Sequence, residues 1–346
     1  MLALKAYHVP PAEGMVKLDA MENPYTLPPE LAREMASRVA AVAINRYPDP
    51  TARRLAARVR EAMAIPDSLG VMLGNGSDEL LQIVSLALAK PDAVVLSLEP
   101  SFVMYRMSAI AAGMRYAGVA LREDFSLDEG AFIRAIAQHR PALTWIAYPN
   151  NPTGNLFPRE AILRAIDAAP GLVVVDEAYY PFSNGATLLD EVGRHPNLLL
   201  VRTVSKLGLA GLRLGVAIGA RDWMQELEKL RMPYNVNVLT AAAADLVLEH
   251  RDVLLEQTQR IVAERSRLEA ALDRMRVQRF PSAANFILVR VPDAPAAFEG
   301  LKQRGILIKT LHGSHPLLAN CLRLTVGTAD ENAKLIEALA SVLSHA

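Results

Sequence analysis

The spacing of hydrophobic and polar positions changes several times along the chain, and each change predicts a different kind of element. Up to about residue 27 the chain carries several prolines and little periodicity, which indicates an extended arm. Helical patterns follow at 28–42, where Pro28 and Pro29 suit a first turn, and at about 51–64. The two prolines of segment 45–50 predict a loop between these helices.

From residue 70 short apolar runs alternate with longer amphipathic stretches, the pattern of a sheet with helices on its faces. The sequence predicts a helix at 78–89 and strands at 71–73, 93–98, 143–147, 172–175, 198–203 and 214–219. The stretches between most strands can hold a helical crossover, so we expect parallel pairing. Only about ten residues separate the last two strands, too few for a crossover, which predicts an antiparallel pair.

Beyond residue 237 the chain becomes mainly helical. We expect helices at 238–249, 253–275, around 295–304 and at the C-terminus, with strands at 286–291, 306–310 and 322–326. Thr328 and Glu331 have the spacing of a capping box before the last helix. The predicted organisation is an arm (1–27), a large α/β domain (28–245) with a mostly parallel sheet and one antiparallel strand, and a small α+β domain (246–346).

Composition narrows the functional classes. The 346 residues suggest two domains at roughly 100–200 residues each, and 51% are hydrophobic, enough for a large core. Basic and acidic residues balance at 37 each, so the chain has no excess positive charge that would favour binding of nucleic acid or anionic lipid. One cysteine, Cys321, fits a reducing compartment, and no long apolar segment predicts a signal or a membrane span. We expect a cytoplasmic protein.

Lys206 is the first candidate for chemistry. It follows the apolar run 198–201 and lies among glycines and apolar residues, including Gly208, Gly211 and Gly215. A lysine is usually a solvated surface charge, but burial can lower the pKa of an amine by up to about 3–5 units and make it a nucleophile. The hypothesis is a lysine that forms a Schiff base. Arg213 offers a planar fork for a phosphate nearby.

Asp176 ends the apolar run GLVVV and is the second candidate. A carboxylate at the end of a buried strand is costly unless a cation or several donors meet it. A pyridinium nitrogen is such a cation, and two charges at about 4 Å attract by about 4 kcal/mol at an effective dielectric near 20. An aspartate that simply caps the next element is the alternative, and the residue alone does not decide between them.

Three further segments follow predicted strands, where ligands of parallel sheets gather. Gly76, Ser77 and Asp78 join a strand to a helix and could present backbone N–H groups to a phosphate, although plain N-capping by Ser77 explains the segment better when it is taken alone. Asn151 lies in the loop YPNNPTG and can donate to a phenolic oxygen, with a turn without a ligand as the alternative. Tyr105 could stack on a flat ring or simply pack in the core.

Metal and hydrolytic chemistry find little support in the sequence. His312 and His315 are three residues apart, but Gly313 and Pro316 argue against a helix that would bring them together. No GxSxG motif is present for a serine hydrolase. We therefore predict no metal site.

Taken together, these segments resemble the fold-type-I pyridoxal-phosphate enzymes and, among them, the histidinol-phosphate aminotransferases. The similarity extends over nearly the whole chain, in the segments KLDAMENPY (17–25), RYPDP (46–50), GNGSDE (74–79), PSFVMY (100–105), YPNNPTG (148–154), VVDEAYY (174–180), RTVSKLGLAGLRLG (202–215) and CLRLTVGT (321–328). Their order and spacing make a chance match of all eight implausible.

The resemblance implies a role for each candidate toward pyridoxal 5′-phosphate. Lys206 would hold the cofactor and move the substrate proton, Asp176 would pair with the pyridine nitrogen, and Asn151 and Tyr179 would bind O3′. Tyr105 would stack on the ring. The phosphate would be held by Ser77, Asp78, Ser205 and Arg213, with Gly76 giving the backbone room.

The resemblance also implies partners. Tyr47 would reach the phosphate of the neighbouring subunit, which makes the protein a homodimer, while Arg323 and Asn23 would face the substrate. Lys309 stands where an arginine is common in the family, so bidentate binding is lost and the charge kept. The arm reads LDAMENPY where LNANENPY is commoner, which places Asp19 and Met21 at two asparagine positions.

The activity that this resemblance implies is exchange of an amino group between L-histidinol phosphate and 2-oxoglutarate, giving imidazole acetol phosphate and glutamate. An aromatic amino acid aminotransferase and a threonine-phosphate decarboxylase on the same scaffold are the alternatives. A sensor domain of a transcription factor is a non-enzymatic alternative, but about 27 residues before the first helix are too few for a helix-turn-helix module.

Overall fold

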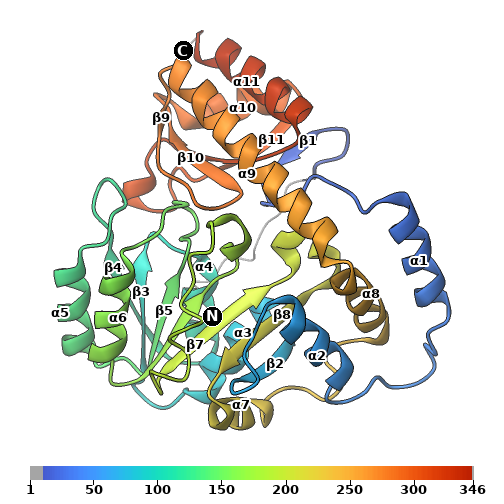
Figure 1. Cartoon of the computed structure of the whole chain (residues 1–346). Helices are drawn as coiled ribbons and strands as arrows, with labels where there is room; N and C mark the ends of the chain where they lie inside the picture. Colours follow the sequence, from blue (N-terminus) through green and yellow to red (C-terminus); the bar gives the residue numbers. More distant parts are fainter. Residues whose placement is uncertain (1–10, 345–346) are drawn as a thin grey trace.

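Two sheets organise the chain in the computed structural model, which describes residues 11–344 (Figure 1). The larger sheet has seven strands in the order β2-β8-β7-β6-β5-β3-β4. These strands are β2 (Gly70–Asn75), β3 (Val94–Glu99), β4 (Arg115–Ala120), β5 (Leu143–Ala147), β6 (Leu172–Asp176), β7 (Leu198–Thr203) and β8 (Leu214–Gly219). Strand β8 is antiparallel to both of its neighbours, and the other pairs are parallel. The predicted sheet, with its antiparallel 198–203 and 214–219 pair, is confirmed.

Helices cover both faces of this sheet, because its central strands are apolar on both sides. Val174 and Leu199 pack in one core with residues of α3, α4 and α7, whereas Val173 and Leu200 pack in another with residues of α2, α5, α6 and α8. The helices are α2 (Arg53–Ala62), α3 (Ser77–Ala87), α4 (Val103–Ala111), α5 (Glu129–His139), α6 (Arg159–Ala168), α7 (Arg221–Glu228) and α8 (Val238–Glu249). The result is a three-layer α/β architecture.

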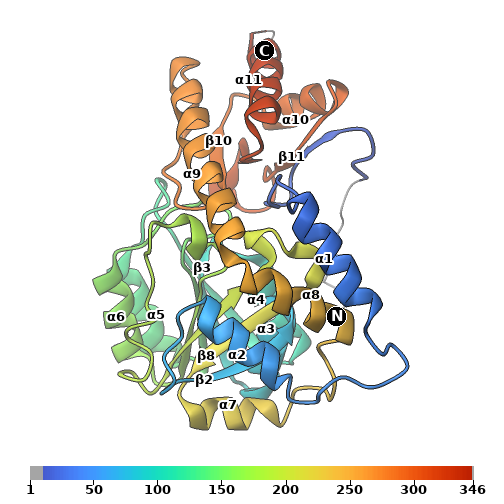
Figure 2. The same cartoon turned by 45° about the vertical axis from the view of Figure 1, so that its right-hand side comes forward.

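The smaller sheet has five strands in the order β1-β11-β12-β10-β9. They are β1 (Val16–Leu18), β9 (Gln278–Arg279), β10 (Phe286–Arg290), β11 (Ile306–Thr310) and β12 (Cys321–Thr325), accompanied by α9 (Arg251–Arg274), α10 (Ala294–Gln303) and α11 (Ala329–Leu343). Strand β1 comes from the predicted arm and pairs in parallel with β11. The arm therefore adds a strand from the N-terminal part of the chain to the sheet of the C-terminal part, and α1 (Pro29–Ala40) follows it (Figures 1 and 2).

Most predicted elements appear, with ends that differ by a few residues. Helix 238–249 and strand 306–310 have the predicted bounds, and the Thr328–Glu331 capping box is present. Strands β1, β4 and β9 were not predicted. Short 3₁₀ helices occur at Tyr180–Phe182, Ser205–Leu207, Ala210–Leu212 and Pro316–Leu318. The domain boundary at residue 245 stays a prediction; α8 and α9 meet at His250, and α9 continues toward the smaller sheet (Figure 2). No helix in the described part of the chain is long and apolar enough to cross a membrane.

Candidate active site

A cavity of about 380 Å³ lies at the carboxyl ends of the central parallel strands. Ala147, Asp176 and Thr203, the last residues of β5, β6 and β7, all line it. Nine of the predicted site residues share it: Ser77, Asp78, Tyr105, Asn151, Asp176, Tyr179, Ser205, Lys206 and Arg213. The remaining lining residues are Ala20, Met21, Phe102, Met104, Ala147, Pro149, Ala178 and Thr203. Residues distant in sequence converge here because strand ends of a parallel sheet meet at one edge.

Lys206 enters the cavity from the short helix Ser205–Leu207, directly after β7. Its Nζ donates to the carbonyl of Ala20 at 3.3 Å and lies 5.7 Å from the centre of the Tyr179 ring. Burial, with a smaller contribution from the charge of Arg323, lowers the pKa of Lys206 to about 8. About one-tenth of the amine is therefore neutral at pH 7, far more than for an ordinary lysine, and this neutral form is the nucleophile.

Asp176 ends β6 and is buried in the floor of the cavity. Its carboxylate accepts from the Tyr105 hydroxyl at 2.8 Å and from the Ala178 N–H at 3.0 Å. Burial nevertheless raises the pKa of Asp176 to about 6. The carboxylate forms no ion pair with any residue in the described range, so its charge is only partly compensated. A cationic group in the cavity would supply the missing compensation.

The opposite end of the cavity has the features of an anion cradle. Helix α3 begins at Ser77, so its free N–H groups and dipole point toward this end. The Arg213 guanidinium reaches the same place and pairs with Asp78 at 3.0 Å. A Cβ on Gly215 would lie 2.6 Å from the backbone of Gly76 and Ser77, so only glycine allows this close approach.

Arg323 does not line the cavity but links Asn151, which does, to the arm. From β12 it donates through Nη1 to Asn151 Oδ1 at 2.7 Å and through Nη2 to the carbonyl of Asp19 at 2.9 Å. Lys309 lies opposite Arg323 in the pairing of β11 with β12. Arg323 and Lys206 therefore contact adjacent residues of the arm, Asp19 and Ala20.

Comparison with known proteins agrees with this geometry. Residues 13–339 match the family of aminotransferases of class I and II. The chain is 55% identical over 338 residues to a histidinol-phosphate aminotransferase of Chromobacterium violaceum, covering 97% of this chain and 95% of that protein. It belongs to this aminotransferase family. Histidinol-phosphate aminotransferase 2 of Cupriavidus pinatubonensis is 53% identical over 349 residues, which cover 99% of this chain and 94% of that protein.

Solved aminotransferase structures share the fold. The histidinol-phosphate aminotransferase of Sinorhizobium meliloti, in complex with pyridoxal-5′-phosphate, matches with a TM-score of 0.86 and 25% identity over 95% of this chain and 90% of that chain. That of Clostridium acetobutylicum has a TM-score of 0.87 at 22% identity, covering 95% and 99% of the two chains. The fold is therefore that of the fold-type-I aminotransferases, as the motifs predicted.

Asn23 lies elsewhere than expected, whereas the positions of Tyr105 and Tyr47 leave their predicted roles open. The ring of Tyr105 is fully buried and stacks on Trp145, with centroids 5.2 Å apart and planes 2° apart, while its hydroxyl serves Asp176. Asn23 does not line the cavity; its amide donates to the Leu207 carbonyl and to Gln257. Tyr47 is 81% exposed, away from the cavity of its own chain, and stacks on Tyr234.

Phe102 and Met21 are cavity residues that the sequence reasoning missed. Phe102 precedes α4 and contacts Tyr105 edge to face, at 5.6 Å and 89°. The segment PSFVMY contains both aromatic residues, three positions apart, and both line the cavity. Met21 comes from the arm, and its presence in LDAMENPY, at a position where asparagine is commoner, was the signal that could have identified it.

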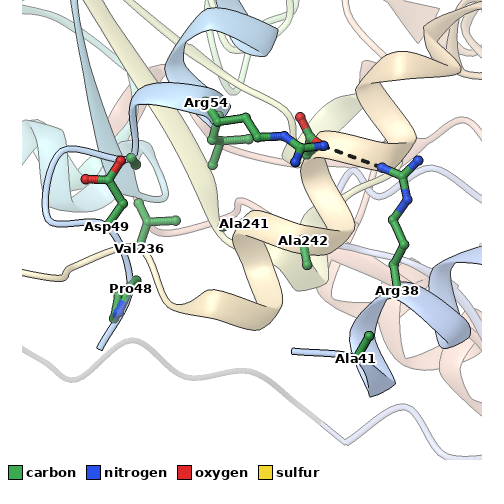
Figure 3. Close-up of a pocket in the computed structure, with 11 residues that line it drawn as sticks. Arg38, Ala41, Pro48, Asp49, Arg54, Val236, Ala241 and Ala242 are labelled. Atoms are coloured by element: carbon green, nitrogen blue, oxygen red, sulfur yellow. Dashed lines mark hydrogen bonds and ion pairs between the residues drawn. The ribbon is translucent and has the colours of Figure 1, made fainter. Parts of the chain in front are cut away.

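A second hollow of about 390 Å³ lies on another part of this aminotransferase (Figure 3). Its charged residues are already paired: Arg54 and Arg38 extend toward one another and contact Asp245 at 2.6 and 3.5 Å. Of the predicted site residues that the structure describes, none lines this hollow. Residues 11–344 also contain no group of three or more side chains that could hold a metal ion. The Lys206 cavity is thus the candidate active site.

Proposed function

We propose that this protein uses pyridoxal 5′-phosphate to exchange an amino group between L-histidinol phosphate and 2-oxoglutarate, forming imidazole acetol phosphate and L-glutamate. Relatives that are 53–55% identical over almost their full length carry the name of that activity. The single observation that carries the proposal is the placement of Lys206, with its lowered pKa, in one cavity with Asp176 and the α3 cradle.

The residues present fit the cofactor. The undercompensated Asp176 suits a protonated pyridine nitrogen, and the cradle of α3, Ser205 and Arg213 suits a phosphate. Asn151 and Tyr179 line the cavity where they could hold the phenolic oxygen. When bound, pyridoxal phosphate supplies an electron sink for the negative charge that develops at the substrate Cα.

Lys206 has two tasks in this proposal. Its Nζ would hold the cofactor, and the same amine, when free, would accept the proton from the substrate Cα and donate it again. The pKa of about 8 suits both directions of proton movement near neutral pH. The contact with Ala20 fixes the amine at the arm side of the cavity.

Arg323 provides the anion-binding group for both amino donors. Glutamate carries a distal carboxylate and histidinol phosphate carries a phosphate, and one planar guanidinium can pair with either. Its present bonds to Asn151 and to the Asp19 carbonyl orient the guanidinium from two sides. Lys309 adds a second positive charge beside it.

Phe102 is a further candidate, beside Tyr105, for contact with the cofactor ring. Both residues line the cavity; the Phe102 ring is partly buried, and the Tyr105 ring has one face against Trp145. Through its hydroxyl, Tyr105 also holds Asp176 in position.

The proposal includes a homodimer in the cytoplasm. Tyr47, Ile44 and Met232 are 81%, 77% and 69% exposed, which is unusual for large apolar side chains outside an interface. In a dimer Tyr47 would reach the phosphate cradle of the partner subunit. The single cysteine, Cys321, is buried, which suits a reducing compartment.

Two experiments test the function. Borohydride reduction of the cofactor-loaded protein, followed by peptide mass spectrometry, should place a pyridoxyl group on Lys206, and an adduct on another lysine would refute the site. With glutamate as donor, imidazole acetol phosphate should outcompete phenylpyruvate. The reverse ranking would favour an aromatic amino acid aminotransferase, and release of carbon dioxide from threonine phosphate would favour a decarboxylase.

A further inference from the structure

Met21 is held in the cavity by a backbone conformation that methionine rarely adopts. Its φ is +54°, in the left-handed region, where Asn and Gly are tolerated far better than a long side chain. Two buried partners fix it: the Met21 N–H donates to Thr325 Oγ1 at 3.1 Å, and the Asn285 amide donates to the Met21 carbonyl at 2.9 Å. Both partners belong to the part of the chain around the smaller sheet.

Backbone strain at a ligand cavity points to a use for the side chain concerned. Among the residues that line the cavity, Met21 and Arg213 are the two non-glycine residues with positive φ. The strain at Arg213 delivers a guanidinium to the anion cradle. At Met21 it delivers a thioether, which is 8% exposed and lines the same cavity.

The thioether faces the substrate side of the site. Its Sδ accepts from the Tyr179 hydroxyl at 3.0 Å. The two residues before it contact the groups that act on the substrate, because Ala20 accepts from Lys206 Nζ and Asp19 accepts from Arg323 Nη2. Segment 19–21 therefore spans the distance between the amine and the guanidinium, with the apolar surface of Met21 turned into the cavity.

We propose that Met21 is a specificity-determining residue that recognises the flat ring of the amino donor. This inference rests on the proposed function, which requires one donor with a ring and one, glutamate, without. A polarisable thioether packs favourably against the edge of an aromatic ring and offers nothing comparable to a carboxylate chain. Met21 thus contributes to binding of the donor with a ring in one half-reaction and contributes little to binding of glutamate in the other.

The test compares two unreactive ligands of the cofactor-loaded enzyme, 3-phenylpropionate and glutarate, through their dissociation constants measured from the absorbance of the bound cofactor. In Met21→Asn, 3-phenylpropionate should bind about two- to tenfold more weakly, the range for loss of one sulfur–aromatic contact, while glutarate stays within about twofold. Met21→Leu keeps the apolar surface and removes the sulfur, so as the matched control it should lose about as much affinity for 3-phenylpropionate as Met21→Asn does.

Folding is separated from recognition by the thermal midpoint. Asparagine adopts the left-handed backbone conformation at a lower energetic cost than methionine, so Met21→Asn should unfold at an equal or higher temperature than the wild type. If this variant does not retain the cofactor, Met21→Gln, which keeps the length of the side chain, serves in the same comparison.

Equal weakening of both ligands, or no change in either, would overturn the inference. Unchanged binding of 3-phenylpropionate to Met21→Leu would also overturn it, because the sulfur would then make no contact with the ring. The outcome is independent of the substrate assignment: if the enzyme prefers phenylpyruvate to imidazole acetol phosphate, the proposed function fails, but both compounds carry a ring and the comparison with glutarate still decides the role of Met21.

Discussion

Asp176 and Glu177 are adjacent in sequence and both buried, yet their surroundings differ completely. Glu177 accepts from Arg202 Nε at 2.9 Å, from the Thr187 hydroxyl and from the Leu188 N–H. Arg202 in turn lies over the Tyr180 ring at 4.1 Å. The pair Glu177–Arg202 is therefore a closed network in which charge and hydrogen bonding are satisfied within the chain.

Asp176 faces the cavity instead, with one hydroxyl and one N–H as donors and with a raised pKa. The two carboxylates face different surroundings because successive residues of a strand point to opposite sides. The comparison teaches that burial alone does not mark a functional charge. The carboxylate that we propose to be functional, Asp176, is the one whose charge is incompletely compensated within the protein.

The strongest test of the comparison breaks the closed network. Glu177→Gln leaves the buried Arg202 without a countercharge, and loss of one partner of a buried pair costs about 3–5 kcal/mol. The free energy of unfolding, measured by urea denaturation, should fall by that amount. The absorbance of the bound cofactor should stay unchanged at temperatures where the variant is folded. A change in stability below about 1 kcal/mol would show that Glu177 is not structural.

Asp176→Asn should have the opposite profile. It removes the anion proposed to pair with the pyridine nitrogen, and an electrostatic contact of this kind is worth about 10²–10³-fold in kcat. The urea midpoint should not decrease, because an undercompensated buried charge is removed. Steady-state kinetics and denaturation of the same preparation check both statements, and retention of more than about one-tenth of kcat would contradict the proposed role.

The pH dependence of stability sharpens the contrast in the cofactor-free protein. The pKa of Asp176 is raised from its usual 3.8 to about 6, so between these values the folded chain holds a proton that the unfolded chain has lost. The stabilising contribution of this carboxyl is complete below pH 3.8 and is lost as the pH rises through about 6. Asp176→Asn should therefore gain stability relative to wild type from pH 4 to 6.5, by about 2–3 kcal/mol.

This window is clear of the other perturbed group in the cavity. Lys206, with a pKa of about 8, remains protonated in both states below pH 7 and so contributes no slope there. Thermal midpoints of the two proteins at half-unit pH steps suffice for the measurement. A difference that is constant from pH 4 to 6.5 would mean that burial does not raise the pKa of Asp176.

Much of the fold and of the site follows from local sequence. The apolar runs that became β5, β6 and β7 fix which residues come last in each strand, and these ends bring Asp176, Asn151 and Lys206 together. The antiparallel strand β8 followed from loop length alone. Strand β1 could not be predicted, because three residues carry no periodicity and their partner, β11, begins at Ile306.

Contacts across long sequence separations account for the other differences. Arg323 meets Asn151 across 172 positions, and Met21 meets Tyr179 across 158, so neither pair leaves a local pattern. The burial of Tyr105 beside Phe102 depends on the direction of the first turn of α4, and helix ends are poorly specified by sequence. The motifs identify the residues that line the cavity, while tertiary packing decides which other residues hold them in place.

The smallest expected effect concerns Tyr105, which holds Asp176 in place through one hydrogen bond. Tyr105→Phe keeps the ring stacked on Trp145 and removes only the hydroxyl that donates to Asp176. A hydrogen bond to a charged group contributes about 1.5 kcal/mol, or about one pKa unit, so the pKa of Asp176 should rise further. The stability difference from Asp176→Asn still begins near pH 3.8 but should keep growing to about one pH unit higher. The value of kcat should fall by about tenfold, because Asp176 remains but is less well held and less readily ionised.

Trp145→Phe is the matched control, because it alters the packing on the Tyr105 ring and leaves the hydroxyl in place. It should change the stability but not the pH at which the stability difference from Asp176→Asn stops growing. If both variants move that pH equally, Tyr105 acts through packing, and Asp176 differs from Glu177 in burial rather than in its hydrogen bonds.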